Sequence, residues 1–356
     1  MTKKQFSAKI NELGQLAGYQ KPEYHQGVLK LDSNENFVIN KQLQQDIIDS
    51  AQKNSDIREY PLGKLDRLIE AVANYVQLPK QMVGFGNGSD QILDMILANF
   101  GSTKTKVLTS NPTFGFFEER CKLYRIPTIK IPFEKDMTLD IADFLSKSKQ
   151  ADILYLDSPN NPTGFQFKKE HMIELIEKFD GIAIVDEAYG EFSDYSMASM
   201  TKKLDNLIVV KTFSKTFGLA GMRLGYVLAN KNFIDVFSRV IQYPYPLNVL
   251  SIEAGILALQ KIKIIQEATD LIKQERTRII KKLRESGAFD VFDSKANFVL
   301  FDARGADKRI YNALLEQGIS IRKLGKIGKH EGCLRVTVGT KDMNSKFLLA
   351  IRDLLK

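Results

Sequence analysis

Short apolar segments alternate with helix-like segments along much of the chain, and this pattern restricts the fold more than any other feature. Runs typical of buried strands lie at residues 106–109, 128–132, 153–156, 182–185 and 207–210. Apolar residues at helical spacing lie between several of them, for example at 114–124 and 169–179. The alternation therefore predicts an α/β fold with a mainly parallel sheet that is covered on both faces.

Polar residues follow the buried strands at the points where these end. The sets are Asn111-Pro-Thr-Phe114, Asp157-Ser-Pro-Asn-Asn-Pro-Thr-Gly164, Asp186-Glu-Ala-Tyr189 and the loop at 211–223. Ligands of open α/β sheets bind beyond the carboxyl ends of the strands. We therefore expect these loops to line one site.

The loop at 211–223 contains a candidate nucleophile, Lys215. A lysine amine reacts with a carbonyl only when its charged form is discouraged, and Arg223 can supply the necessary field. Ser214 and Arg223 also suit a phosphate, and Gly218 and Gly221 let backbone come close to it. An amine beside a phosphate site suggests pyridoxal phosphate. A solvated Ser-Lys turn remains the alternative for this loop taken alone.

A glycine-rich turn at 83–90 precedes a predicted helix at 91–100. Free backbone amides at a helix N-terminus form an anion site, so Gly88, Ser89 and Asp90 are candidates for holding a phosphate. Turns of this kind also begin many helices that bind no ligand.

Composition indicates an ordinary globular protein of two domains. The chain has 356 residues, 44% of them hydrophobic and 26% charged, with a net charge of +8 spread along its length. The basic residues form no stripe along the sequence, so we expect no nucleic-acid binding. The positive net charge does suit an anionic small substrate. Cys121 and Cys333 lack a pairing pattern, and the three histidines lack metal-ligand spacing. Without an apolar leader or a run of about 18 apolar residues, we expect a cytoplasmic location and no membrane contact.

Residues 1–30 predict an arm with a short helix, in which Tyr19 is an anchor or a ligand. The polar cluster at 31–36 either lines a pocket or caps the helix predicted at 41–53. Tyr60 lies in an exposed break before a second helix at 65–76.

The C-terminal part predicts a smaller α+β domain. A helical stretch at 249–283, interrupted near Lys261, is followed by strands at 298–301, 319–322 and 334–338 and by helices at 310–317 and 342–355. The predicted domains are the arm at 1–30, a large domain at 31–245 and a small domain at 246–356.

Several of these motifs resemble those of the fold type I pyridoxal-phosphate aminotransferases. They are Asn161-Pro-Thr-Gly164, Asp186-Glu-Ala-Tyr189, Ser214-Lys215 and Arg223. Within that family, Leu31-Asp-Ser-Asn-Glu-Asn36, Arg58-Glu-Tyr60-Pro and Gly332-Cys-Leu-Arg335-Val-Thr-Val-Gly339 are most similar to the histidinol-phosphate aminotransferases. The resemblance covers nearly the whole chain. It implies a large domain with a mainly parallel sheet and a smaller α+β C-terminal domain.

The resemblance implies pyridoxal 5'-phosphate as cofactor and assigns its contacts. Lys215 would form the Schiff base and then transfer the proton, and Asp186 would pair with the pyridine nitrogen. Tyr189 and Asn161 would bind the phenolic oxygen. Phe114 would lie on the ring face, or alternatively be a core aromatic. The implied phosphate ligands are Ser89, Asp90, Thr212, Ser214, Arg223 and, from a second subunit, Tyr60.

The same resemblance implies the substrate residues. Arg335 matches the position that holds the anionic end of the substrate, and Arg322 matches the second arginine, for the phosphate of histidinol phosphate. Two guanidiniums suit a dianion, although each could instead be a strand-edge arginine paired with a carboxylate. Tyr19 and Asn36 complete the set. If Tyr60 reaches the partner's site, two chains share each site in a homodimer.

The implied reaction is transamination between histidinol phosphate and 2-oxoglutarate in histidine biosynthesis, with a phosphorylated amine and a 2-oxo acid as small-molecule substrates. Phe37-Val-Ile-Asn40 departs from the family's aromatic-Gly-Pro pattern, which leaves the substrate side chain open. The alternatives are an aromatic-amino-acid aminotransferase, a phosphothreonine-type decarboxylase and a pyridoxal-binding protein without catalysis.

Overall fold

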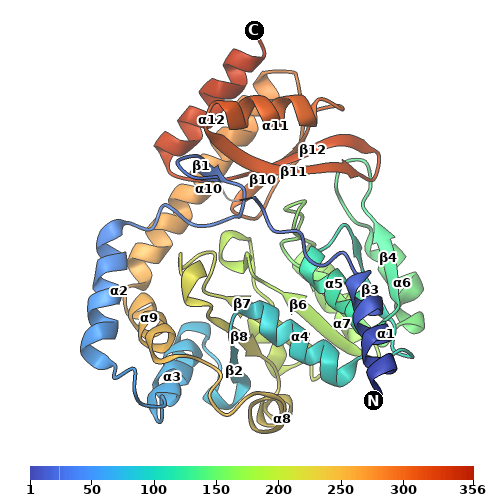
Figure 1. Ribbon diagram of the computed structural model, residues 1–356, viewed down its shortest axis with the longest axis vertical. Helices are drawn as coiled ribbons and strands as arrows, with labels where there is room; N and C mark the ends of the chain where they lie inside the picture. The colour runs from blue at the N-terminus through green and yellow to red at the C-terminus, as the bar shows by residue number, and fades with distance from the viewer. Residues whose placement is uncertain (24) are drawn as a thin grey trace.

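The computed structural model describes residues 1–23 and 25–356, which form two packed units, each built on its own sheet (Figure 1). The larger sheet has the strand order β2-β8-β7-β6-β5-β3-β4. Its strands are β2 (Val83–Gly86), β3 (Val107–Asn111), β4 (Thr128–Pro132), β5 (Ile153–Asp157), β6 (Ile182–Asp186), β7 (Leu207–Thr212) and β8 (Gly225–Leu228). Strands β3 to β7 are parallel, as the alternation predicted, and β8 runs antiparallel to both of its neighbours, β2 and β7.

The smaller sheet has the order β1-β11-β12-β10-β9. Its strands are β1 (Leu29–Leu31), β9 (Asp290–Val291), β10 (Phe298–Asp302), β11 (Ile319–Ile327) and β12 (His330–Thr337). Strand β1 pairs parallel to β11, and the other pairings are antiparallel. The arm thus contacts the large unit, where Glu12 pairs with Arg125, and β1 then joins the small sheet before the chain builds the large unit.

The helices agree with most of the predicted ranges. They are α1 (Lys3–Gly14), α2 (Lys41–Asn54), α3 (Lys64–Val76), α4 (Ser89–Phe100), α5 (Gly115–Leu123), α6 (Ile141–Lys147), α7 (Lys169–Glu177), α8 (Lys231–Val236), α9 (Val249–Gln260), α10 (Ile262–Glu285), α11 (Asp307–Glu316) and α12 (Lys341–Leu354). Asparagine at the N-cap starts several of them, as where Asn40 accepts from the Leu43 amide at 2.8 Å. Asn40 therefore caps α2, and the polar cluster at 31–36 is free for another role.

The packing moves the domain boundaries away from those predicted. Helix α9 packs on α2 and α3, and its apolar residues belong to the core of the large unit. Within the C-terminal part of the chain, the first residue that belongs to the core of the small unit is Ile272, inside α10. The change from one unit to the other thus lies within a continuous helix rather than at residue 246, and β1 belongs to the small unit rather than to the arm or the large domain.

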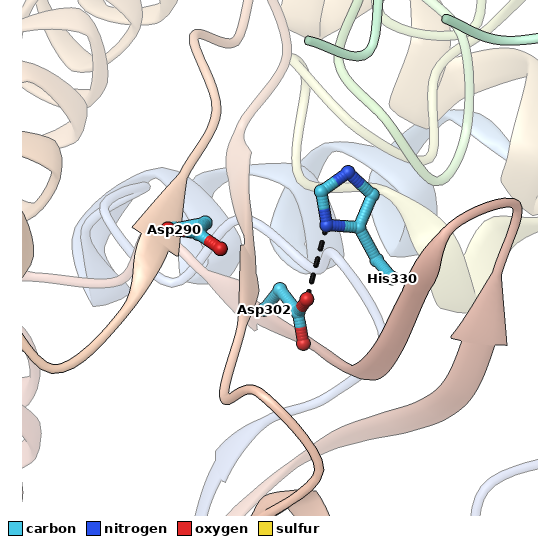
Figure 2. Close-up of side chains that lie close together, drawn as sticks. All are labelled: Asp290, Asp302 and His330. Carbon is cyan, nitrogen blue, oxygen red and sulfur yellow. Dashed lines mark hydrogen bonds and ion pairs between the residues drawn. The ribbon is translucent and has the colours of Figure 1, made fainter. Parts of the chain in front are cut away.

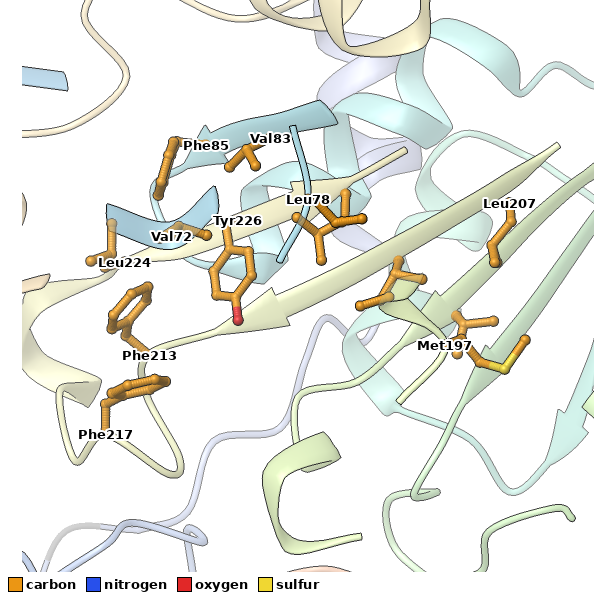
Figure 3. Packing of buried hydrophobic residues seen from close by; sticks show 14 of the residues in the cluster. Val72, Leu78, Val83, Phe85, Met197, Leu207, Phe213, Phe217, Leu224 and Tyr226 are labelled. Atoms are coloured by element: carbon orange, nitrogen blue, oxygen red, sulfur yellow. The ribbon is translucent and has the colours of Figure 1, made fainter. Parts of the chain in front are cut away.

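The large core anchors the lysine loop. Phe213 and Phe217 lie two residues on either side of Lys215 and are fully buried, with ring centroids 4.4 Å apart. They pack with Leu224 and Tyr226, near Phe85 of β2 (Figure 3). Burying two phenylalanines contributes about 2 kcal/mol each, which holds the loop in one conformation. Nowhere in residues 1–23 or 25–356 is a helix both long and apolar enough to span a bilayer.

Candidate active site

A cavity of about 690 Å³ lies beyond the carboxyl ends of the large sheet, with the small unit on its other side. It collects most of the residues that the sequence singled out. Those that line it are Tyr19, Ser89, Asp90, Phe114, Asn161, Asp186, Tyr189, Thr212, Ser214, Lys215, Arg223, Arg322 and Arg335. Residues of the large unit and two arginines of the small unit therefore face one space.

Lys215 is the amine of this cavity. Its Nζ donates to the carbonyl oxygen of Ser33 at 3.0 Å and lies 5.7 Å from the ring centroid of Tyr189. Burial lowers the pKa of Lys215 to about 8, and the charges of Arg335 and then Arg223 act in the same direction. The positive charge that was expected to lower the pKa of Lys215 is therefore present, and Arg335 lowers it more than Arg223 does. A larger share of this amine is neutral near pH 7 than for an ordinary lysine.

One end of the cavity is built for an anion. No described side chain caps the first turn of α4, so the amides of Ser89 and Asp90 are free for a ligand. Gly88 has φ +82°, and a Cβ there would lie 2.6 Å from Arg223 Nη2, so glycine is needed for the guanidinium to approach. Arg223 Nη2 donates to Asp90 Oδ2 at 3.2 Å, and the hydroxyls of Thr212 and Ser214 are 3.0 Å apart.

Asp186 lies at the end of β6 and is only 3% exposed. Tyr155 OH and the Ala188 amide each donate to it at 3.0 Å. Burial, and next the charge of Asp157, raise the pKa of Asp186 to about 7. A buried carboxylate with a raised pKa is suited to hold a cationic or protonated ring nitrogen.

Arg335 and Tyr189 lie between the two units. Arg335 Nη2 donates to the Asp32 carbonyl at 3.0 Å, and Nη1 donates to Asn161 Oδ1. Arg335 Nε is buried without a described partner. Tyr189 OH accepts from Asn34 Nδ2 at 2.9 Å, so the polar cluster at 31–36 reaches the site.

Arg322 and Tyr19 lie toward the arm. Arg322 Nη2 donates to the Gln20 carbonyl at 2.7 Å rather than to a carboxylate. The Tyr19 ring packs edge-on against Phe114, with centroids 6.2 Å apart. Phe114 is half-buried between the cavity and this aromatic contact.

Asn36 corrects one prediction. It was expected at the substrate, but it lies outside the cavity lining, and both ends of its amide are engaged in the protein. Its Nδ2 donates to the Thr216 carbonyl at 2.8 Å and its Oδ1 accepts from the Val38 amide at 3.0 Å. Asn36 therefore holds the lysine loop, and Asn34 is the asparagine that faces the cavity.

Comparison with known proteins places this geometry in a family. Residues 26–351 match the family described as aminotransferase class I and II. The chain belongs to this family. It is 36% identical over 327 residues to the histidinol-phosphate aminotransferase of Pyrococcus furiosus, with 92% of each chain covered. It is 33% identical over 333 residues to that of Thermoanaerobacter pseudethanolicus, covering 92% of this chain and 93% of the other.

Solved structures agree. The histidinol-phosphate aminotransferase of Clostridium acetobutylicum matches with a TM-score of 0.83 and 27% identity, covering 91% of this chain and 98% of that one. The fold type I resemblance predicted from the motifs is thereby confirmed.

The predicted site residues did not include Asn34, Asp157 or Tyr155, which contact Tyr189, Asn161 and Asp186. Asn34 lies in the 31–36 cluster with φ +55°, a conformation that asparagine tolerates better than most residues. Asp157 opens a polar set that was recognised, although the residue itself was passed over. Tyr155 lies in an apolar strand, and no local pattern distinguishes it from a core aromatic.

A second polar cluster of the aminotransferase lies in the small unit (Figure 2). Asp290, Asp302 and His330 bring possible metal-ligand atoms within 4.8 Å of one another. His330 Nδ1 is 3.0 Å from Asp302 Oδ2, and Nε2 is 2.7 Å from the Lys135 carbonyl oxygen. Asp290 pairs with Arg304 at 2.7 Å. Because these atoms are already engaged, the cluster serves to join the small unit to the loop after β4.

Proposed function

We propose that the chain is a pyridoxal-phosphate-dependent transaminase that exchanges the amino group between histidinol phosphate and 2-oxoglutarate in histidine biosynthesis. The observation that carries the proposal is one cavity with three features: a buried amine of lowered pKa, an anion site on one side of it, and two arginines on the other. The two relatives compared above by sequence are both named histidinol-phosphate aminotransferase, which supports the choice of substrate.

The residues present fit the cofactor. Free amides of Ser89 and Asp90, with the hydroxyls of Thr212 and Ser214 and the guanidinium of Arg223, would hold its phosphate. Asp186 would hold the ring nitrogen, because a buried carboxylate with few donors needs a positive partner. When bound, the cofactor supplies an electron sink for the charge that develops at the substrate carbon.

The chain's own residues then bind substrate and move protons. Lys215 Nζ would take the proton from the substrate carbon and deliver it on the cofactor side of the imine, and a pKa of about 8 suits both transfers near neutral pH. Tyr189 and Asn161 would orient the ring oxygen. Asn34 donates to Tyr189 OH, which fixes where that hydroxyl lies.

Arg322 and Arg335 would recognise the anionic part of the substrate. Arg335 is 7% exposed with one unpaired nitrogen, so an incoming anion would satisfy it. Among residues 1–23 and 25–356, Arg322 bonds only the Gln20 backbone carbonyl, which is a weak partner for a guanidinium. Two such cations favour a phosphate over a single carboxylate.

We further propose a homodimer in which Tyr60 completes the partner's site. Tyr60 is 69% exposed and does not line the cavity of its own chain, and its ring stacks on Tyr245 at 4.3 Å between centroids. Two exposed tyrosines held face to face offer a preformed surface to a second subunit. We also place the enzyme in the cytoplasm, since Cys121 and Cys333 are both free and buried.

The test is chemical trapping of the cofactor. Borohydride reduction of the loaded protein should fix one cofactor per chain on the peptide that carries Lys215. In the Lys215→Ala variant no cofactor should be fixed, while the dimer and the fold remain. Trapping at another lysine of the wild-type protein would refute the assignment of Lys215.

A further inference from the structure

Asp157 and Asp186 end neighbouring parallel strands and lie side by side. They are direct register partners of β5 and β6. Because register partners on adjacent strands point to the same face, both carboxylates face the same cavity, which both line. Their exposed fractions are only 7% and 3%. The sheet thus brings a second buried carboxylate next to the one expected to hold the cofactor ring.

The two carboxylates have different hydrogen bonds. Asp157 accepts from Thr113 Oγ1 at 2.9 Å, Asn160 Nδ2 at 2.8 Å and the Asn161 amide at 2.8 Å. From the described part of the chain, Asp186 accepts only two bonds, from Tyr155 OH and the Ala188 amide. Since donors stabilise the charged form of a carboxyl group, Asp157 is the member of the pair that is better suited to remain ionised.

No lysine, arginine or histidine nitrogen within residues 1–23 and 25–356 forms an ion pair with either carboxylate. Around the pair lie Tyr155 of β5, Asp90 of α4, Tyr189, and the cations Lys215 and Arg223 of the lysine loop. Two adjacent buried negative charges are costly unless a proton or a cation lies between or beside them. The pair is therefore built to receive positive charge from a ligand.

Resting on the proposed function, we propose that Asp157 is a positioning residue that keeps the cofactor's ring nitrogen protonated by acting through Asp186. Its fixed charge adds to the field at the ring nitrogen. Its bond to the Asn161 amide also links that field to the asparagine expected at the ring oxygen.

Asp157→Asn tests this proposal because it keeps the shape and removes the charge. Cofactor affinity is measured by titrating the apoenzyme with pyridoxal phosphate and with its 1-deaza analogue, which has no ring nitrogen. Without the charge of Asp157, the pKa of the bound ring nitrogen should fall by about one unit. Because the protonated ring is the form that is bound, the variant should bind pyridoxal phosphate roughly tenfold more weakly. Its affinity for the deaza analogue should not fall. Equal losses for both compounds, or none for either, would overturn the proposal.

Stability of the apoenzyme against pH gives a second readout. Burial raises the pKa of Asp157 to about 6, and burial together with Asp157 raises that of Asp186 to about 7. Both values exceed those of the unfolded chain, so the folded state holds protons that the unfolded state has released. The free energy of unfolding should therefore fall as pH rises from about 4 to about 7. Asp157→Asn should flatten this slope.

Thr113→Val is the matched control, because it removes one hydrogen bond to Asp157 and leaves both charges. It should retain the pH slope and the preference for pyridoxal phosphate over the deaza analogue. Loss of that preference in Thr113→Val would mean that hydrogen bonding and not charge is responsible. Wild-type protein that fails to fix the cofactor on Lys215 would instead refute the proposed function, whatever Asp157→Asn does.

Discussion

Replacing Lys211 by methionine should destabilise the enzyme strongly, because Lys211 is a buried cation between two carboxylates. It lies on β7, is 4% exposed, and its Nζ is 3.0 Å from Glu187 Oε2 and 3.0 Å from Glu191 Oε1. Burial alone would lower the pKa of Lys211, but the two glutamates more than offset this and hold it well above the usual value. Gly190 makes the contact possible, since a Cβ there would lie 2.8 Å from Nζ.

The magnitude follows from the charges that remain. Without Lys211, the buried Glu187 and the partly buried Glu191 lose their cation, and removing one partner of a buried ion pair costs about 3–5 kcal/mol. For 356 residues, 4 kcal/mol corresponds to a melting temperature lower by roughly 5 °C. The variant should also bind the cofactor less well, because Glu187 follows Asp186 directly and Thr216 Oγ1 donates to Glu191 at 3.4 Å.

Thermal unfolding of four proteins tests this reasoning: wild type, Lys211→Met, Glu191→Gln and the double variant. Glu191→Gln should lower the melting temperature only slightly, because Lys211 and Glu187 remain as an ion pair whose charges cancel. The double variant should recover about half of the melting temperature that Lys211→Met loses, because only Glu187 then lacks a cation. Glu187 also still accepts hydrogen bonds from Ser196 and from the Met197 amide. A Lys211→Met protein as stable as wild type, or a double variant with simply additive losses, would refute the account.

Two further predictions concern the arginine pair and the junction between the units. Arg322→Ala should lower kcat/KM for histidinol phosphate by roughly 10- to 150-fold, which is the value of one charge-assisted hydrogen bond. The kcat/KM for glutamate should fall much less, because Arg335 remains. Equal losses for the two substrates in steady-state kinetics would make Arg322 a structural residue. His330→Phe should lower the free energy of unfolding by about 1–3 kcal/mol in denaturant titration, because Asp302 and the Lys135 carbonyl lose their partner. His330→Gln should lower it less. An unchanged free energy of unfolding in both variants would contradict the role of this junction.

Strand position was the part of the fold that local sequence could predict. Buried parallel strands such as Ile182–Asp186 are apolar throughout, and the polar residues that follow them meet at one edge of the sheet, so the lysine loop and Asp186 were placed together correctly. Strand β2 was taken for a turn because it contains Gly84 and Gly86. These glycines are tolerated because neighbouring side chains fill the space that a Cβ would occupy. A Cβ at Gly84 would lie 3.0 Å from Val227, and a Cβ at Gly86 would lie 2.5 Å from Ile92.

The remaining differences depend on contacts between distant residues. Asn34 and Asn36 cannot be told apart within the polar cluster of the sequence. They differ in their contacts with distant residues, since Asn34 bonds Tyr189 and Asn36 bonds Thr216. The role of Asp157 depends on its register with Asp186, which no local pattern encodes. The predicted domain boundary at residue 246 could not take such contacts into account, because α9 joins the large core by packing on α2 and α3.

The most direct measurement is a titration of the purified, cofactor-loaded protein with histidinol phosphate and, separately, with phenylalanine, with the absorption of the bound cofactor as readout. The account predicts that low concentrations of histidinol phosphate convert the cofactor to its amine form, that 2-oxoglutarate reverses the conversion, and that phenylalanine acts only at far higher concentrations. Preferential conversion by phenylalanine, or no conversion by histidinol phosphate, would contradict it.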